Sequence, residues 1–199
     1  MRQTKEVHRL CVFSGSSTGH QLEYREAAKD LGCALVRRQI DLVYGGARVG
    51  LMGFIADAVL AAGGHVIGVI PEALVVKEVA HKDLSDLRVV GSMHQRKAVM
   101  MELADGFIAL PGGWGTLEEF FEVLTWGQLG LHRKPCGLLN VCGYFDGLLS
   151  FVEHSISEGF VRSECRAMIS VASSANELID LLNAYEPPVV EKWIDRASA

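Results

Sequence analysis

The chain has 199 residues, of which 49% are hydrophobic, and its formal net charge at pH 7 is −5. This length and composition suit one globular domain and exclude a disordered chain, while the acidic balance argues against a nucleic-acid-binding surface. No apolar run approaches the ~18 residues of a membrane helix, and residues 1–6 contain no signal-peptide core. The five cysteines and seven histidines show no metal-binding or redox spacing, so we expect a cytoplasmic protein without a metal site.

Apolar runs alternate with stretches of helical spacing along the whole chain. In chain order, strands are expected at 8–13, 40–44, 65–70, 87–90, 106–110, 136–141 and 168–171. Helices are expected at 22–38, 51–62, 92–104, 117–131, 144–158 and 175–185. Segment 72–86 mixes charged and apolar residues without regular spacing, and we interpret it as a lid or an interface element.

The expected strands are continuous apolar runs, which is typical of a parallel sheet that is buried on both faces. We therefore predict an α/β fold: a single doubly wound, mainly parallel sheet with helices on both faces, Rossmann-like. One nucleotide-binding domain would cover residues 1–186, and Pro187 and Pro188 would open a C-terminal tail over 187–199. Ligands of such sheets bind at the carboxyl ends of the strands.

Three glycine-rich turns follow expected strands, and each would lie at that same edge. They cover residues 14–19, 45–50 and 111–116, and they begin with Ser14 and Gly15, with Gly45 and Gly46, and with Pro111. Residues 15–19 formally match the Gly-x-Ser-x-Gly nucleophile elbow, but they follow the first strand and no oxyanion-loop motif is evident. We interpret their small hydroxyl-bearing side chains as the lining of a ribose or phosphate pocket.

The third turn has the strongest physical rationale for binding an anion. It joins a buried strand to a helix, so backbone N–H groups at the helix N-terminus would converge on one spot. Glycines let an anion approach the backbone closely, although the spacing is neither a Walker A loop nor the dinucleotide fingerprint. The sequence therefore predicts a phosphate site at Gly112, Gly113, Trp114, Gly115 and Thr116.

Glu119 has two interpretations that spacing alone does not separate. It lies about one helical turn inside the expected helix, where a carboxylate would face the ligand that the phosphate carries. Thr116 to Glu119 also fits a capping box, with Thr116 as the N-cap residue and Glu119 in the third helical position. Residues 174–177 fit the same box without any nearby chemistry, so both interpretations stay open.

Arg96 and Lys97 follow a similar capping pattern that begins at Ser92. Cations are unfavourable near a helix N-terminus because of the helix dipole. Their placement suggests an anionic ligand or a carboxylate partner, and the alternative is a solvated basic face.

The combination of these motifs resembles the Lonely Guy family of cytokinin-activating phosphoribohydrolases, which were formerly labelled lysine decarboxylases. The likeness spans about residues 8–185 and rests on 11–17, 42–46, 49–53, 93–97 and 111–119. It implies an enzyme that hydrolyses the N-glycosidic bond of a nucleoside 5′-monophosphate, such as AMP or N6-isopentenyl-AMP, to free base and ribose 5-phosphate. It also implies no cofactor and a homodimer or higher homo-oligomer, for which apolar helix residues at 98–101 and 120–121 offer faces.

By this resemblance Arg96 and Glu119 are the catalytic pair. The implied substrate-binding positions are Glu78, Lys97, Gly113, Trp114, Gly115, Thr116, Leu117, Glu118 and Thr125. The sequence departs from the family where Ser14, the pair Ala47 and Arg48, and Trp114 replace the common Cys, Gly-Ser and Tyr. Arg48 would add a phosphate contact or face solvent.

Two other functional classes are considered. One is a non-catalytic nucleotide-binding carrier or sensor of the same fold, against which the presence of both Arg96 and Glu119 argues. The other is a pyridoxal-phosphate decarboxylase, but no lysine stands in an evident cofactor motif.

Overall fold

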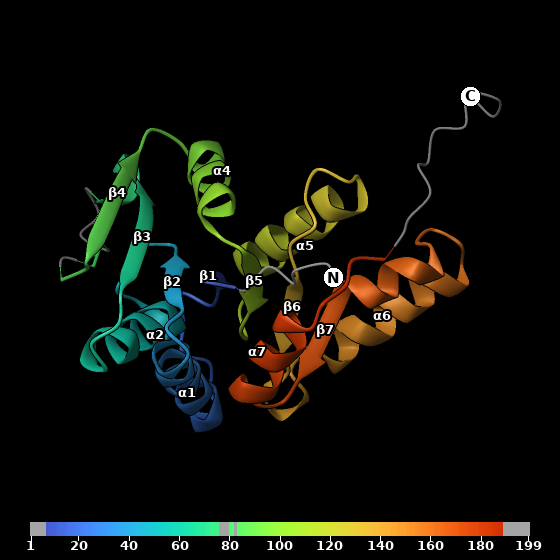
Figure 1. The fold of residues 1–199 in the computed structure, drawn as a ribbon, viewed down its shortest axis with the longest axis horizontal. Helices are drawn as coiled ribbons and strands as arrows, with labels where there is room; N and C mark the ends of the chain where they lie inside the picture. Colours follow the sequence, from blue (N-terminus) through green and yellow to red (C-terminus); the bar gives the residue numbers. More distant parts are fainter. Residues whose placement is uncertain (1–6, 76–79, 82, 189–199) are drawn as a thin grey trace, which may run out of the picture.

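The computed structural model describes residues 7–75, 80–81 and 83–188, so Glu78 lies outside the described residues. Its centre is a seven-stranded sheet in the order β4-β3-β2-β1-β5-β6-β7, with every neighbouring pair parallel (Figure 1). The strands are β1 (Arg9–Phe13), β2 (Asp41–Tyr44), β3 (Val66–Pro71), β4 (Asp86–Val90), β5 (Gly106–Ala109), β6 (Cys136–Leu139) and β7 (Ile169–Ala172). The predicted parallel sheet is confirmed.

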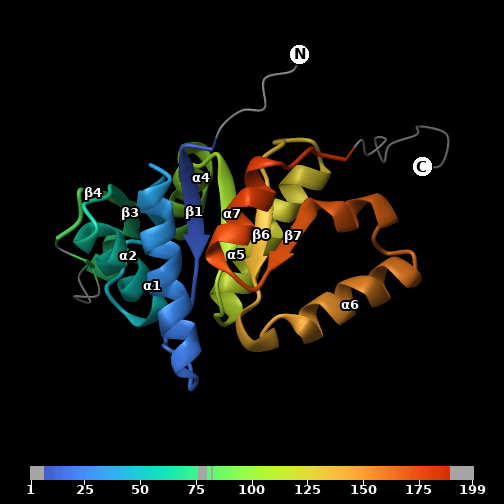
Figure 2. The ribbon, with the colours of Figure 1, turned by 60° about the horizontal axis from the view of Figure 1, so that its bottom comes forward.

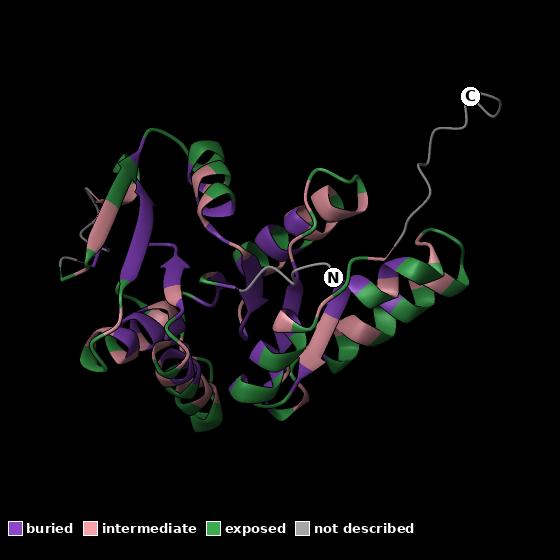
Figure 3. Cartoon of the chain, in the orientation of Figure 1, coloured by how far each residue is buried: buried purple, intermediate pink, exposed green. Residues whose placement is uncertain are grey.

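Helices cover both faces of the sheet, as Figure 2 shows. One face carries α1 (Leu22–Arg37), α2 (Gly50–Ala61) and α7 (Ala175–Asn183), and the other carries α4 (Met93–Leu103) and α5 (Trp114–Gln128). Successive β1 residues alternate between the two cores: Leu10 and Val12 face α1, and Cys11 and Phe13 face the opposite side. The central strands β1 and β2 are therefore buried after their first residues, Arg9 and Asp41, which are half-buried (Figure 3).

The remaining elements are shorter or lie at the periphery. A short helix, α3 (Glu72–Val75), follows β3, and α6 (Asp146–Ser157) follows β6 through the 3₁₀ turn η1 (Val141–Gly143). A second 3₁₀ segment, η2 (Ser163–Met168), leads into β7. In the described part of the chain, none of the helices combines the length and apolar character that crossing a membrane requires.

Part of the irregular segment 72–86 is anchored to the second glycine turn. The His81 backbone N–H donates to the Gly46 carbonyl at 2.9 Å, and Ala80 forms an antiparallel bridge with Ala47. The His81 ring is buried, and its Nε2 lies 2.9 Å from an Asp57 carboxylate oxygen of α2. The segment's role as a lid or an interface element stays a prediction.

Two element boundaries differ from the sequence prediction for identifiable reasons. The strand expected to reach residue 141 ends at Leu139, because the Asn140 side chain accepts from the Phe145 N–H at 2.8 Å and stabilises a turn. The helix expected from residue 117 begins at Trp114, with Gly113 as its N-cap residue. A glycine N-cap contributes no side-chain hydrogen bond, so the pattern of side chains did not mark this start.

Candidate active site at the carboxyl edge of the sheet

The three glycine-rich turns meet at the carboxyl edge of the sheet, as predicted. The Gly15 N–H donates to the Pro111 carbonyl at 3.0 Å, which joins the first turn to the third. The Leu51 N–H donates to the Gly15 carbonyl at 3.0 Å, which joins the first turn to α2 after the second turn. The three turns therefore form one connected platform.

A cavity of about 260 Å³ opens on this platform. It is lined by Gly15, Ser16, Ser17, Thr18, Gly19, Tyr24, Leu51, Pro111, Gly112, Gly113 and Tyr144. None of these lining residues carries a charged side chain, so an anion here would be held by backbone N–H groups and hydroxyls. Tyr24, Leu51 and Gly113 belong to the beginnings of α1, α2 and α5, and the positive ends of three helix dipoles therefore converge on the cavity.

Ser14 lies at the end of β1, directly before the cavity-lining turn. Its side chain is buried, and its Oγ has no hydrogen-bond partner among the described residues. A buried hydroxyl without a partner is costly, because it has lost the hydrogen bonds that water would make. Ser14 itself is not part of the cavity lining, so this unsatisfied hydroxyl lies behind the first turn.

The start of α5 rules out one of the two interpretations of Glu119. Because Gly113 is the N-cap residue, Thr116 is the third residue of the helix and Glu119 is the sixth. The capping-box interpretation of Thr116 and Glu119 is therefore wrong. The Ser174 side chain, by contrast, accepts from the Glu177 N–H at 3.4 Å, as the capping-box pattern of residues 174–177 predicts.

Glu119 forms an ion pair with Arg96 inside the protein. The Arg96 Nη1 donates to Glu119 Oε1 at 2.9 Å, and both side chains are only 10% exposed. The Arg96 Nε donates to the carbonyl of Val69, within β3, 3.1 Å away. On its remaining side the guanidinium lies against Gly45, where a Cβ atom would overlap it. The arginine is thus fixed by α5, β3 and the second glycine turn together.

Burial changes the protonation of the groups around this ion pair. Removal from water raises the pKa of Glu119, and the positive charge of Arg96 opposes that rise. The Cys11 thiol of β1 is also buried, and both burial and the Glu119 carboxylate raise its pKa. Cys11 therefore stays a neutral thiol beside the carboxylate.

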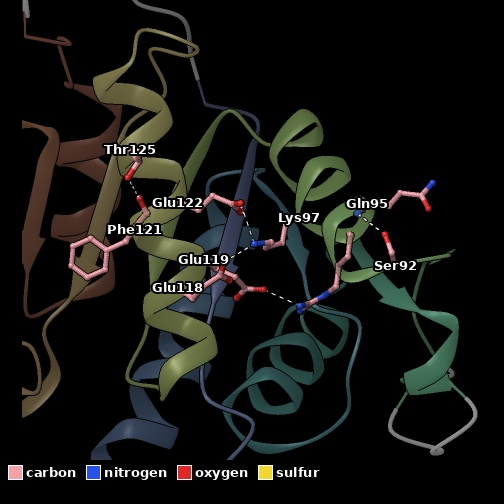
Figure 4. A network of polar contacts seen from close by, with 9 residues as sticks. Ser92, Gln95, Lys97, Glu118, Glu119, Phe121, Glu122 and Thr125 are labelled. Atoms are coloured by element: carbon pink, nitrogen blue, oxygen red, sulfur yellow. Dashed lines mark hydrogen bonds and ion pairs between the residues drawn. The ribbon is translucent and has the colours of Figure 1, made fainter. Parts of the chain in front are cut away.

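Lys97 forms a second set of ion pairs between α4 and α5 (Figure 4). Its Nζ lies 2.5 Å from Glu118 Oε1 and 3.0 Å from Glu122 Oε1. The hydrogen bond to Glu118 is the main reason that the pKa of Lys97 is raised. With Arg96 buried and Lys97 paired, the solvated basic face is wrong, and carboxylate partners explain both cations.

Several predicted site residues lie away from both the cavity and the ion pair. The Trp114 side chain is 90% exposed, and Gly115 is exposed next to it. Leu117 packs against the core below α5. Thr125 is exposed, and its hydroxyl donates to the Phe121 carbonyl at 2.7 Å. Arg48 is also exposed and is not part of the cavity lining.

Two aromatic residues of the cavity wall were missed by sequence reasoning. Tyr24 and Tyr144 both line the cavity, and their rings meet edge to face with centroids 5.6 Å apart. Tyr144 follows β6 closely, and its place after a strand was the available signal, because all carboxyl ends of a parallel sheet share one edge. Its contact with the third turn joins segments 32 residues apart, which no local pattern reveals.

The cavity at the N-terminus of α5 and the Arg96–Glu119 ion pair lie apart along this helix. Gly113 lines the cavity, and Glu119 lies six residues further along α5, a rise of about 9 Å at 1.5 Å per residue. A ligand with a phosphate in the cavity and a sugar extending along α5 would therefore bring its far side to the Arg96–Glu119 pair. This geometry suits a phosphorylated nucleoside.

Comparison with known proteins was made at the level of sequence and of structure. A family model described as "possible lysine decarboxylase" matches residues 52–182. The cytokinin riboside 5′-monophosphate phosphoribohydrolases LOG7 and LOG1 of Arabidopsis thaliana are each 53% identical over 94% of this chain, covering 87% and 88% of their own lengths. The enzyme LOG of Oryza sativa is 52% identical over 90% of this chain and 74% of its own.

Solved structures share the fold at much lower identity. A molybdenum cofactor binding protein from Rippkaea orientalis matches with a TM-score of 0.69 and 23% identity, over 90% of this chain and 98% of that one. The molybdenum cofactor carrier protein of Chlamydomonas reinhardtii matches with a TM-score of 0.68 and 20% identity, over 88% and 96% of the two chains. At such identities the likeness is one of fold alone.

Proposed function

The chain belongs to the Lonely Guy family of cytokinin riboside 5′-monophosphate phosphoribohydrolases, and from that premise we propose that it hydrolyses the N-glycosidic bond of adenosine 5′-monophosphates. The substrates are AMP or its N6-substituted forms, and the products are the free base and ribose 5-phosphate. The observation that carries the proposal is the buried Arg96–Glu119 ion pair, which lies against the second glycine turn at the same edge of the sheet as a cavity whose lining has no charged side chain.

Glu119 acts on the reacting sugar in this proposal. As the base departs, the anomeric carbon acquires the positive charge of an oxocarbenium ion, which a nearby carboxylate stabilises. The same carboxylate takes a proton from the attacking water as the bond to the base breaks and the bond to water oxygen forms. The departing base takes up a proton from solvent to become the neutral product, and Glu119 releases its own proton to solvent before the next turnover. Its burial strengthens both effects, because charges interact more strongly away from water.

Arg96 stabilises negative charge that develops on the departing base and keeps Glu119 ionised and oriented. The guanidinium is preorganised by the Val69 carbonyl and by Gly45, so little reorganisation accompanies the reaction. The phosphate binds at Gly112 and Gly113, and this remote binding energy positions the sugar. The mechanism uses no metal ion and no organic cofactor.

Incubation with AMP, N6-isopentenyl-AMP and adenosine tests this function and its dependence on the phosphate. We expect free base and ribose 5-phosphate from the two nucleotides, detected by chromatography. Adenosine should react at least about a hundredfold less efficiently, because it lacks the group that the cavity binds. Equal turnover of AMP and adenosine would indicate an ordinary nucleosidase and remove the phosphate anchor.

The same incubation separates the alternatives. A carrier or sensor would bind AMP, as calorimetry detects, without releasing adenine. A pyridoxal-phosphate decarboxylase would be yellow when purified with its cofactor, whereas a phosphoribohydrolase is colourless. The decarboxylase is supported by the description of the matching family as a possible lysine decarboxylase, and the Arg96–Glu119 geometry favours the hydrolase.

We also propose that the protein is a homodimer or a higher homo-oligomer. Much of the apolar surface at 98–101 and 120–121 is buried in the fold, since Met100, Met101 and Phe120 belong to the core. The support comes instead from exposed Met93 on α4 and from Phe121 and Thr125, which share one face of α5.

Sedimentation or light scattering at micromolar concentration tests the assembly. We expect a mass at least twice the 21.7 kDa of one chain. A single species of 21.7 kDa would contradict the proposal. The cytoplasmic location is a further proposal, which rests on five cysteines that are all free thiols and which cell fractionation would check.

A further inference from the structure

The turn between β6 and α6 has an uncommon backbone. Cys142 has φ 51° and ψ 32°, in the left-handed region that non-glycine residues seldom adopt, and Gly143 follows with φ 68°. The Asn140 side chain stabilises this turn: its Oδ1 accepts from the Phe145 N–H at 2.8 Å, and its Nδ2 donates to Asp146 at 2.7 Å. Such a conformation persists only where the surroundings enforce it.

The turn presents Tyr144 to the glycine-rich turn of the candidate active site. The Tyr144 hydroxyl donates to the Gly112 carbonyl at 2.6 Å. The ring meets Tyr24 edge to face at 5.6 Å and Phe145 at 5.0 Å, and the Phe145 side chain is fully buried in the core. Tyr144 is thus held by its buried neighbour Phe145, by ring packing against Tyr24 and by its hydrogen bond to the Gly112 carbonyl.

This hydrogen bond acts on the peptide group between two consecutive glycines, Gly112 and Gly113. Gly112 is packed closely against Thr116 and Gly15, whereas Gly113 has open space where a side chain would be, so the Tyr144 hydroxyl adds a restraint on the open side of the turn. Because the peptide unit is planar and trans, holding the Gly112 carbonyl also fixes the direction of the Gly113 N–H. Gly113 is the N-cap residue of α5 and lines the cavity.

We propose that Tyr144 is a positioning residue for substrate phosphate: its hydroxyl holds the Gly112–Gly113 peptide in the orientation that binds the anion. This rests on the proposed function, since it assigns the cavity to the 5′-phosphate. Preorganised donors bind an anion more tightly because no free energy is lost in ordering them. Tyr144 acts through the peptide group and takes no part in the chemistry.

Tyr144→Phe removes the hydroxyl and keeps the ring contacts. We expect Kd for AMP and for ribose 5-phosphate, measured by calorimetry, to rise about five- to tenfold. KM for AMP should rise by a similar factor while kcat stays within about twofold, because phosphate binding is equal in the ground and transition states. Tyr185→Phe, a half-buried tyrosine outside the cavity, is the matched control and should change none of these values.

A second variant tests the turn itself. Asn140→Ala keeps the Tyr144 hydroxyl but removes the side-chain hydrogen bonds that stabilise the turn. We expect KM for AMP to rise, by a smaller factor than in Tyr144→Phe. If wild type neither binds nor hydrolyses AMP, the proposed function fails. If wild type does both and Tyr144→Phe has unchanged Kd values, or loses kcat with KM unchanged, the positioning role is wrong. A fall in melting temperature without the change in KM would likewise assign Tyr144 a purely structural role.

Discussion

Glu119→Gln should lower kcat for AMP hydrolysis at least about a hundredfold. Glutamine keeps the size of the side chain and an oxygen that accepts from Arg96, but it has neither the negative charge nor the basicity of a carboxylate. General acid–base groups contribute about 10²–10⁴ in rate, and the variant loses electrostatic stabilisation of the sugar as well. Single-turnover kinetics with saturating AMP measures the effect on chemistry directly.

The same substitution should also destabilise the fold, which a helix cap would not predict. Glu119 is the carboxylate partner of a buried arginine, and removing its charge leaves Arg96 without compensation. We expect a loss of about 1–3 kcal/mol, measured by urea unfolding, because the amide oxygen retains part of the interaction. Glu177→Gln is the control: this residue lies in the first turn of α7, whose N-cap is Ser174, and the change should alter neither stability nor turnover.

The pH dependence of activity gives Glu119 a second readout. Since burial raises the pKa of Glu119 above its usual value of 4.5, the acidic limb of kcat/KM should lie above that pH. Activity falls as pH drops through the raised pKa, because the protonated carboxyl neither stabilises positive charge nor accepts a proton. Near wild-type turnover by Glu119→Gln at every pH would show that this carboxylate only compensates Arg96.

The sequence predicted the parts of the fold that depend on local patterns. Continuous apolar runs indicated a parallel sheet, and the turns 14–19, 45–50 and 111–116 were correctly expected at one edge because parallel strands share that edge. The predicted start of α5 was wrong, because Gly113 caps the helix without a side chain and because Thr116 to Glu119 matched the capping-box pattern by chance. Backbone capping leaves little trace in a sequence.

The site depends on contacts between distant segments, and these were predicted least well. The sequence suggested a carboxylate partner for Arg96, but it did not indicate that Gly45 would lie beneath the guanidinium. It gave no sign that Tyr144 would reach the Gly112 carbonyl. Both contacts follow from tertiary packing, which brings side chains of one element against the backbone of another.

Gly45→Ala should lower kcat/KM for AMP at least about a hundredfold while leaving the protein folded. An added Cβ would lie less than 3.0 Å from Arg96 Nη2 and 3.2 Å from its Cζ, closer than packed atoms allow. The other near neighbour, Met52 Sδ at 3.3 Å, ends a flexible side chain that can give way. Gly45 is not among the positive-φ residues, so alanine fits the backbone there.

The guanidinium must therefore move, and its bonds decide the consequence. It is held at the Val69 carbonyl and at Glu119, so a shift of about 1 Å breaks the geometry of one or both, and a misplacement of that size costs about 10² in rate. Gly147→Ala, in the first turn of α6 with open space around it, is the control and should stabilise slightly without changing kinetics. Thermal unfolding and AMP kinetics of both variants measure the difference. If Gly45→Ala keeps wild-type kcat/KM, the position of Arg96 against the second glycine turn does not affect turnover. The role of Arg96 would then be limited to its ion pair with Glu119.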